Sequence, residues 1–302
     1  MMSSKGYHLP VLLKDCIAGL LIDPCGVYVD VTFGGGGHSK EILKSLTKGR
    51  LIGFDQDSDA QKNVPDDSRF ELVHQNFKYM KSNLRLLGVT KVDGVLADLG
   101  VSSHQFDVPD RGFSIRFDAE LDMRMDQRIK LTAKHILNEY SQEELYRVFR
   151  SYGEVRNLGK LVSVIVSARE GEGVSTVSQF KELIADCIDK RKPSQYLAQV
   201  FQALRIEVND EMNVLQEFLR QSAEVLKPGG RLVVMSYHSL EDRLVKNFIK
   251  AGNFEGKMEQ DFFGNVIKPF KAINNKVIIA SKEELEMNNR ARSAKLRIAE
   301  KL

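Results

Sequence analysis

Residues 29–38 read VDVTFGGGGH and determine most of what can be inferred about this fold. The run contains the β-branched residues Val29 and Val31, which favour a buried strand, and four glycines end it. A helical pattern with Ile42 and Leu43 follows. Glycines at a strand-to-helix turn permit positive φ angles and let a ligand approach the backbone. The stretch therefore predicts an elongated cofactor that lies across the strand ends of an α/β sheet.

The composition is that of an ordinary globular protein with room for two domains. The chain has 302 residues, of which 42% are hydrophobic and 28% are charged. No apolar stretch reaches the roughly 18 residues that a membrane span needs. The opening residues 1–6 contain neither a signal-peptide core nor an Arg-rich transit pattern. We therefore expect a cytoplasmic protein without membrane association.

Metal and disulfide chemistry find little support in the sequence. Three cysteines, Cys16, Cys25 and Cys187, lie far apart and form no Cys-x-x-Cys pair. The six histidines include no His-x-x-x-His pair. We expect no metal site. The net charge of +3 leans weakly toward a polyanionic partner.

The first hundred residues alternate between strand and helix signals. A helical lead-in covers residues 11–21, and a second helix begins at Gly37. Such alternation predicts a parallel, doubly wound sheet. The expected strands are 27–32, 51–54, 70–73 and 92–97.

The alternation of strand and helix signals stops between residues 107 and 198, where helical patterns replace buried strands. Capping-box spacing marks helix starts at Ser141, with Glu144, and at Thr176, with Gln179. Residues 158–168 contain enough valine and isoleucine to form a strand instead, but we predict a helix there.

Alternation then resumes toward the end of the chain. A long helix over 196–226 is stopped by the Pro-Gly-Gly at 228–230, and a strand follows at 231–237. Apolar runs at 266–267 and 277–279 predict a closing hairpin. We therefore expect one nucleotide-binding sheet with an inserted helical domain. Its parts are residues 1–106, the insertion 107–198, and residues 199–302 with a basic C-terminal segment.

Acids near the glycines indicate which cofactor the sheet binds. A dinucleotide fold places a third glycine where this chain has Ser39, and Asp30 before the turn would repel a pyrophosphate. The same carboxylate can accept hydrogen bonds from the ammonium group of S-adenosylmethionine. Asp55, at the end of the second strand, suits the ribose hydroxyls of either cofactor. Gly34 and Gly36 would line the turn, although both acids are also compatible with simple caps.

Two residues after later strands extend the predicted pocket. Phe77 can pack against adenine, or it can be a core residue at a helix start. Asp98 ends the fourth strand and would face the reactive end of the cofactor. Its alternative is a turn-initiating cap before Gly100.

Long segments of the chain resemble one family, the bacterial 16S rRNA (cytosine-N4)-methyltransferases. The match runs in order from about residue 8 to the C-terminus. The matching segments are DVTFGGGGHS (30–39), DLGVSS (98–103) with Gln105, RGFS (111–114), LDMRMD (121–126), FQALRIEVN (201–209), SYHSLEDR (236–243) and RARSAKLR (290–297).

The resemblance implies a class I, Rossmann-like methyltransferase that uses S-adenosylmethionine. It would methylate a cytidine of small-subunit ribosomal RNA at the decoding centre, on naked RNA or on the 30S particle. A homodimer is compatible with this organisation. The family pattern places the cofactor against Gly36, Gly37, His38, Asp55, Phe77, Asp98 and Gln105.

Two other function classes remain open at this stage. One is an rRNA-binding assembly factor that keeps a cofactor pocket without turnover. The other is a nicotinamide dehydrogenase, which Ser39 and Asp30 disfavour. Transfer of a labelled methyl group separates the first from an enzyme, and a thermal shift with a nicotinamide cofactor would revive the second.

Methylation of cytosine N4 requires acceptors for its hydrogens, because the nitrogen lone pair is delocalised into the ring. We expect Asp98 or nearby backbone carbonyls to accept from N4, and Phe106 or Phe113 to stack on the base. Alignment of the reacting atoms within about 3–3.5 Å supplies much of the acceleration. His238, after the fifth strand, can relay a proton or contact RNA, or it can be structural.

The RNA surface must be local because the net charge is small. One basic set lies at the entrance to the insertion, and a second lies near the C-terminus. For each set the alternative is a solvated charged face without a ligand. The first set includes a phenylalanine, which suits unstacked bases. The predicted RNA-binding residues are Arg111, Phe113, Arg116, Arg124, Arg290, Arg292, Lys295 and Arg297.

Overall fold

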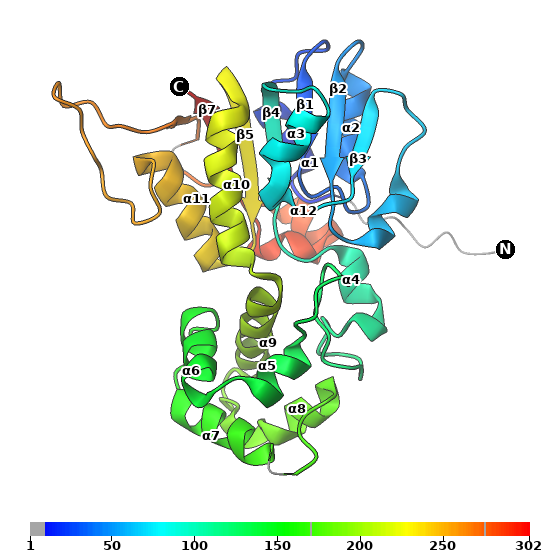
Figure 1. Cartoon of the computed structure of the whole chain (residues 1–302), viewed down its shortest axis with the longest axis vertical. Helices are drawn as coiled ribbons and strands as arrows, with labels where there is room; N and C mark the ends of the chain where they lie inside the picture. The colour runs from blue at the N-terminus through cyan, green and yellow to red at the C-terminus, as the bar shows by residue number, and fades with distance from the viewer. Residues whose placement is uncertain (1–9, 170, 275) are drawn as a thin grey trace. The chain divides into compact units, whose positions relative to one another are not determined.

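The structure is a computed structural model that describes residues 10–302 except 170 and 275. The chain forms two compact units (Figure 1). The sheet unit comprises Met1–Gly100 and Met212–Leu302, and the helical unit comprises Val101–Glu211. Residues 1–6, from which we expect no leader, lie outside the described part. Within that part, no helix has the length and apolar character needed to cross a bilayer.

A seven-stranded sheet organises the sheet unit, in the order β3-β2-β1-β4-β5-β7-β6. Strands β1 to β5 are parallel, and β7 is antiparallel to both of its neighbours. This order, with an antiparallel β7, is that of the class I methyltransferases, so the predicted α/β fold class is confirmed. The strands are β1 (Val27–Asp30), β2 (Arg50–Phe54), β3 (Phe70–Val73), β4 (Val92–Asp98), β5 (Leu226–Ser236), β6 (Phe270–Ala272) and β7 (Lys295–Lys301).

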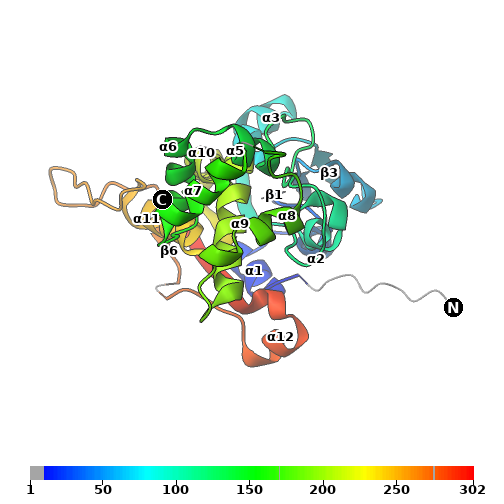
Figure 2. The same cartoon turned by 90° about the horizontal axis from the view of Figure 1, so that it is seen from below.

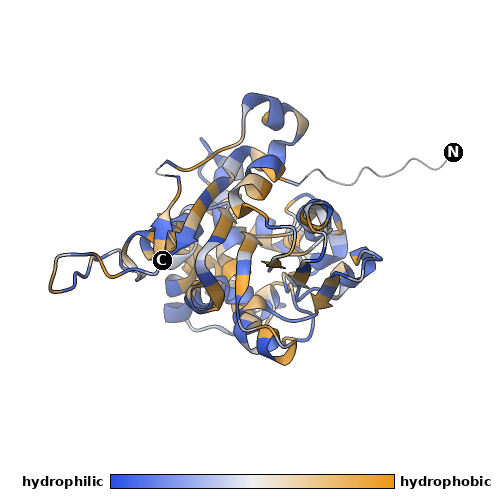
Figure 3. Ribbon diagram, turned by 90° about the horizontal axis from the view of Figure 1, so that it is seen from above, coloured by the Kyte–Doolittle hydropathy of each residue, from blue (hydrophilic) through white to orange (hydrophobic). Residues whose placement is uncertain are grey.

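Helices cover both faces of this sheet because successive strand residues point to opposite sides. Tyr28 packs into a core with α1 and α2, whereas Val29 packs into a core with α3, α10 and α11. Figure 3 shows apolar residues running along the strands between these helices. The helices are α1 (Leu13–Leu20), α2 (Gly37–Ser45), α3 (Met80–Leu86), α10 (Glu211–Val225), α11 (Ser239–Ala251) and α12 (Lys282–Met287).

The early strands and helices agree with the sequence, but the predicted long helix is wrong. Residues 196–226 form two helices, α9 (Pro193–Asn209) and α10, which Asp210 separates. Asp210 has a φ of 51°, in the left-handed region that an α-helix cannot contain. Aspartate tolerates this conformation better than most residues, so no glycine marks the break in the sequence.

The expected closing hairpin is also wrong. Val266 pairs with Gln260 in a projecting loop, and Ile278 forms an isolated bridge with Leu296. The last antiparallel strands are β6 and β7 instead. Strand β7 reads KLRIAEK, where a mixture of buried and partly exposed positions replaces the apolar run that we expected.

Six helices make up most of the helical unit. Helix α9 packs against α5 and α6, and α6 also packs against α7. The predicted capping boxes at Ser141 and Thr176 form, and residues 158–168 are helical as predicted. The remaining helices are α4 (Ser103–Asp107), α5 (Ala133–Glu139), α6 (Gln142–Ser151), α7 (Leu158–Ala168) and α8 (Val177–Leu183).

Candidate cofactor and catalytic site

Three carboxylates lie at the carboxyl ends of adjacent parallel strands. Asp30 ends β1, Asp98 ends β4, and Asp55 follows β2. The strand order reverses direction between β1 and β4, and ligands of open α/β sheets bind in the crevice at such a switch point. The sequence placed these acids at strand ends, and the sheet order brings the strand ends side by side.

The glycine turn after β1 has an open side at Gly34. Gly34 has a φ of 50°, which glycine adopts without strain. Its N–H donates to Asp55 Oδ2 at 2.8 Å, and Asn63 Nδ2 donates to its carbonyl at 2.9 Å. A Cβ added at Gly34 would meet only the carbonyl oxygen of Thr32, at 3.8 Å. These hydrogen bonds therefore fix the backbone on both sides of Gly34, and space remains beside its Cα.

The next two predicted cofactor glycines are packed by the protein itself. Gly36 has a φ of 72°, and a Cβ there would lie 3.0 Å from the ring of Phe33. A Cβ at Gly37 would lie 2.3 Å from Pro10 Cγ. These two glycines allow close packing at the start of α2, whatever they contribute to a ligand.

Asp30 is occupied by the turn that it precedes. Only 1% of the residue is exposed. Ser39 Oγ donates to its Oδ2 at 2.7 Å, and the N–H of Thr32 donates to its Oδ1 at 3.1 Å. Asp30 thus joins β1 to the first turn of α2. In this arrangement Asp30 stabilises the turn, and both of its carboxylate oxygens already accept hydrogen bonds from the protein.

Asp98 keeps a quarter of its side-chain surface exposed, so it is the accessible acid at the end of β4. The hydroxyl of Tyr237 donates to its Oδ1 at 2.8 Å, and its own N–H donates to Thr32 Oγ1 at 2.7 Å. The sequence did not identify Tyr237. Its signal was its place directly after β5, because β5 pairs with β4 in the sheet.

Burial makes these acids harder to ionise. It raises the pKa of Asp55 to about 6, although N–H donors from Asp57 and Gly34 oppose the shift. Burial likewise raises the pKa of Asp98 to about 6, against the opposing effects of His38 and Tyr237. The pKa of Asp30 is also raised by burial. Acids that are buried without full compensation are typical of functional sites.

His38 links the start of α2 to the segment before α1. The residue is 6% exposed, and its Nε2 lies 3.1 Å from the carbonyl oxygen of Val11. A carbonyl only accepts, so Nε2 carries the proton in this pair. Nδ1 then faces Asp98 Oδ2 at 3.9 Å. His38 therefore lies at the predicted site and is the nearest basic group to Asp98 among the described ion pairs.

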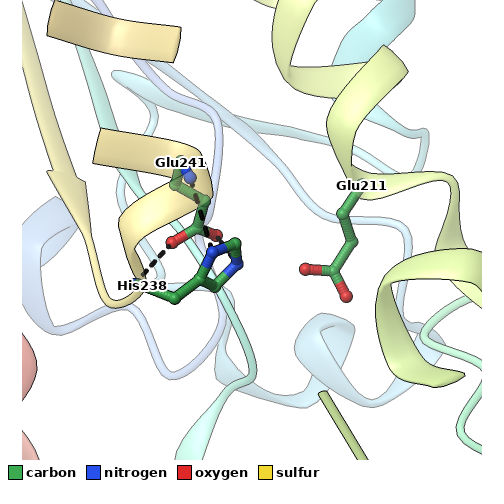
Figure 4. Close-up of side chains that lie close together, drawn as sticks. All are labelled: Glu211, His238 and Glu241. Atoms are coloured by element: carbon green, nitrogen blue, oxygen red, sulfur yellow. Dashed lines mark hydrogen bonds and ion pairs between the residues drawn. The ribbon is translucent and has the colours of Figure 1, made fainter. Parts of the chain in front are cut away.

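His238 begins α11 and forms a capping box with Glu241, as Figure 4 shows. The N–H of Glu241 donates to His238 Nδ1 at 3.4 Å, and Glu241 Oε2 accepts from the N–H of Tyr237 at 2.9 Å. His238 Nε2 is buried and makes no hydrogen bond of good geometry among the described residues, but it lies 3.3 Å from Glu241 Oε1. The structure thus gives His238 a capping role and places both ring nitrogens against Glu241.

The other two predicted cofactor residues have local structural partners. Phe77, in a 3₁₀ turn after β3, makes an edge contact with Phe218 at 5.4 Å and keeps part of its surface exposed. Gln105 belongs to the helical unit and is 4% exposed. Its Oε1 accepts from the N–H of Ser102 at 3.1 Å in a capping box that begins α4.

The first predicted RNA set divides by burial. Arg111 and Phe113 are each only 5% exposed. Arg111 Nη2 donates to the carbonyl of Arg124 at 2.9 Å, and Phe113 packs in the core of the helical unit. Arg124 forks onto Asp122 with bonds of 2.8 and 2.7 Å. These three side chains stabilise the loop before α5, whereas Arg116 is exposed.

The second predicted RNA set lies around η5 and β7. Arg292 is exposed, and Arg290 is partly buried. Arg297 Nε donates to Asp242 Oδ1 at 2.7 Å, and Lys295 Nζ lies 3.6 Å from Asp242 Oδ2. One carboxylate of α11 therefore partly neutralises both β7 cations.

The strand-end residues fit S-adenosylmethionine better than a dinucleotide. The observation that tests the fit is the open space beside Gly34, flanked by Asp55 with its elevated pKa. Acidic groups suit a cofactor with ribose hydroxyls and an ammonium group, and they oppose a pyrophosphate. Asp55, the Gly34 turn, Phe77 and Asp98 are the residues that would hold the cofactor.

Sequence comparisons with known proteins agree with this assignment. A sequence model described as the MraW methylase family matches residues 5–302. The chain is 60% identical over 298 residues to the "Ribosomal RNA small subunit methyltransferase H" of Parabacteroides distasonis, covering 98% of each chain. It is 57% identical to the protein of the same name from Flavobacterium johnsoniae, covering all of both chains. A solved rRNA methylase from Streptococcus thermophilus is 13% identical, with a TM-score of 0.40, over 95% of this chain and 93% of that one.

Proposed function

Since the chain belongs to the MraW methylase family, we propose that it transfers a methyl group from S-adenosylmethionine to N4 of a cytidine in 16S ribosomal RNA. The observation that carries the proposal is the row of strand-end carboxylates beside the open Gly34 turn. The names of the full-length relatives support an rRNA substrate. We further propose that the target lies at the decoding centre and that the enzyme acts in the cytoplasm.

We assign the acceptor role to Asp98. The bound cofactor supplies an electrophilic methyl group. Asp98, as a carboxylate, would accept a hydrogen bond from the amino group and turn the nitrogen lone pair toward that methyl group. A fixed acceptor that needs no reorganisation also stabilises the positive charge that develops on the nitrogen.

We assign Tyr237 and Thr32 to the positioning of Asp98. The Tyr237 hydroxyl holds one carboxylate oxygen, and Thr32 Oγ1 holds the backbone N–H of the same residue. Burial raises the pKa of Tyr237, so it remains a neutral donor. Its hydrogen bond favours the ionised form of Asp98, which is the form able to accept.

His238 remains our candidate for proton removal or for a contact with RNA. Its Nδ1 accepts from the N–H of Glu241, so Nε2 carries the proton of the neutral ring. The neutral ring at this position donates rather than accepts through Nε2. A direct role as a proton acceptor would therefore require the capping contact to break first.

The RNA surface that we propose for the helical unit is smaller than the sequence suggested. Arg116 and the partly exposed rings of Phe106 and Phe117 remain available. Arg111 and Phe113 have structural roles and are left out. The exposed Arg292 and the partly buried Arg290 stay in the proposal as the part of the C-terminal set outside β7.

Nucleoside mass spectrometry of 16S rRNA tests the proposed function. Cells that lack the protein should lose N4-methylcytidine at one position, and cells that regain it should recover the modification. In vitro, labelled S-adenosylmethionine should transfer its methyl group to naked rRNA or to assembled small subunits, and the comparison identifies the substrate. Binding of rRNA without transfer would instead support an assembly factor that keeps an idle cofactor pocket.

A further inference from the structure

A narrow arm projects from the sheet unit between α11 and β6, and Figures 1, 2 and 3 all show it extending outward. We define the arm as residues 253–269. Gln260 and Val266 pair across it in an antiparallel bridge, and the N–H of Ile267 donates to the carbonyl of Glu259 at 2.8 Å. The arm is thus a short two-stranded extension with its own hydrogen bonds.

The base of the arm is anchored on the sheet unit. The ring of Phe254 stacks on that of Phe248, with centroids 5.1 Å apart. The guanidinium of Arg220 lies 4.9 Å from the Phe254 centroid. Asn247 Nδ2 also donates to the carbonyl of Phe254 at 2.8 Å. These contacts fix where the arm leaves the domain.

The tip of the arm is held by one aspartate rather than by packing. Asp261 Oδ1 accepts from the N–H groups of Phe263 and Asn265, both at 2.9 Å. Gly264 closes the turn with a φ of 83°. The hydrogen bonds from Asn265 lower the pKa of Asp261, so its carboxylate is ionised near neutral pH. The side chains of the two tip phenylalanines take no part in these hydrogen bonds.

Those two rings are almost entirely in solvent. Phe262 is 99% exposed and Phe263 is 85% exposed, and their centroids lie 5.8 Å apart with the rings nearly perpendicular. The turn is ordered, yet it leaves both apolar rings in solvent and not packed against the protein. Such features mark interaction sites.

A basic groove of about 260 Å³ lies at the base of the same arm. It runs between α11, the end of the arm, β6 and β7. Its lining contains four cations, three apolar residues and one asparagine. The lining residues are Lys246, Ile249, Lys250, Lys268, Ala272, Asn274, Arg297 and Ile298.

Most of the positive charge in this groove is not neutralised. Arg297 is bonded to Asp242, the carboxylate that it shares with Lys295. In the described part of the chain, no ion pair joins a carboxylate to Lys246, Lys250 or Lys268. The nearby arm acids Glu255 and Glu259 are exposed and have no place in the groove lining. Three free ammonium groups around one groove favour a polyanion.

We propose that the arm and the groove form a second RNA-binding site, separate from the cofactor edge. Lys246, Lys250 and Lys268 bind backbone phosphates, and Phe262 and Phe263 stack on unpaired bases. Lysines for phosphates beside aromatic rings for bases are the combination that RNA loops require. The inference rests on the proposed function because it takes ribosomal RNA as the ligand.

The aromatic half of the site is tested with three double variants of the tip. F262A/F263A should weaken binding to protein-free 16S rRNA by roughly tenfold or more, measured by filter binding. F262Y/F263Y keeps the stacking faces and should bind like the wild type. F262L/F263L keeps apolar area without a π face and should behave like the alanine variant. L21A/L86A removes two other exposed apolar side chains and serves as the control.

The charged half is tested with K246E/K250E. It should weaken RNA binding and lower the slope of log affinity against log salt, because fewer counterions are released. K48E/K91E makes the same change in net charge at two exposed lysines that precede β2 and β4, and it should have a much smaller effect. Affinity for S-adenosylmethionine should be unchanged in every variant, which excludes misfolding.

The outcomes separate this inference from the proposed function. A wild-type protein that transfers no methyl group to rRNA contradicts the proposed function. A wild-type protein that does transfer, together with tip and groove variants that bind rRNA normally, overturns the second site. A tip defect that appears only with assembled particles, or that leucine rescues, also overturns it and points to a protein partner.

Discussion

The carboxyl edge of the sheet and the arginine-rich start of the helical unit are both dense in charge, yet the fold treats them differently. At the sheet edge, burial raises the pKa of Asp55 and Asp98 to about 6. In the helical unit, burial also acts to raise the pKa of Asp122, but hydrogen bonds from Arg124 outweigh it and the pKa is lowered. Arg111 Nη2 donates to the backbone carbonyls of Arg124 and Met125. Burial therefore dominates the pKa values of the acids at the sheet edge, whereas hydrogen bonds from arginine dominate that of Asp122.

This difference separates binding residues from structural ones. A buried charge without compensation costs stability, so it persists where a ligand or substrate uses it. A charge that is already matched inside the protein gives no such signal. Sequence alone cannot distinguish the two cases. Arg111 and Arg116 belong to the same predicted basic set, and the structure shows that Arg111 is buried and Arg116 is exposed.

The largest effect that this comparison predicts is the loss of catalysis in D98N. Asparagine keeps the size of the side chain and can still accept from Tyr237, but it carries no charge. We expect the single-turnover rate of methyl transfer to fall by roughly 10²–10⁴-fold, the range for a positioned acceptor or base. Labelled transfer to 16S rRNA measures the rate, and calorimetry measures cofactor affinity separately. A D98N enzyme that binds the cofactor and methylates at the normal rate would remove Asp98 from the chemistry.

Parts of the molecule differ in how far sequence could predict them. Strands β1, β2 and β4 were visible because their runs are apolar and buried and are followed by, or end at, an acid. Strand β7 was missed because its charged residues alternate with apolar ones, although it lies between β5 and β6 in the sheet. The acids of the site were found from their place after strands. Tyr237 was not, because its bond to Asp98 depends on β5 lying beside β4.

The second prediction tests whether Arg111 is structural. R111A leaves the carbonyls of Arg124 and Met125 without this donor inside a packed loop. We expect the free energy of unfolding of the helical unit to fall by about 2–4 kcal/mol. Chemical denaturation followed by circular dichroism measures it.

The exposed Arg116 provides the matched control for Arg111. R116A should change stability by no more than about 0.5 kcal/mol, since surface substitutions rarely do more. It should weaken RNA binding instead. If R111A were as stable as R116A and lost only RNA affinity, the assignment of Arg111 as a structural residue would be wrong.

The third prediction concerns the pH dependence of stability. The pKa of Asp98 is raised from 3.8 to about 6, so the folded state binds this proton more tightly than the unfolded state does. Its ionised form therefore costs stability, with no cost below about pH 4 and the full cost above about pH 6. Relative to the wild type, D98N should gain about 1–3 kcal/mol across this window, measured by urea unfolding.

Asp67 offers the opposite sign within the same unit. Hydrogen bonds from Arg69 lower the pKa of this partly exposed acid to about 2. D67N should lose stability, relative to the wild type, as pH rises from about 2 to 4. Equal signs for D67N and D98N would contradict the assignment of Asp98 as a carboxylate raised by burial.

The smallest effect is the most specific, because it isolates one hydrogen bond at the edge of the sheet. In Y237F the carboxylate of Asp98 loses the hydroxyl that favours its ionised form, so its pKa should rise above the wild-type value of about 6. Activity that requires ionised Asp98 is lost as pH falls through that pKa. The acid limb of the pH–rate profile should therefore move upward by roughly one pH unit, the equivalent of a single net hydrogen bond. The rate at pH 9 should change far less, and a uniform loss of rate at every pH would instead mean that Tyr237 only packs against the site.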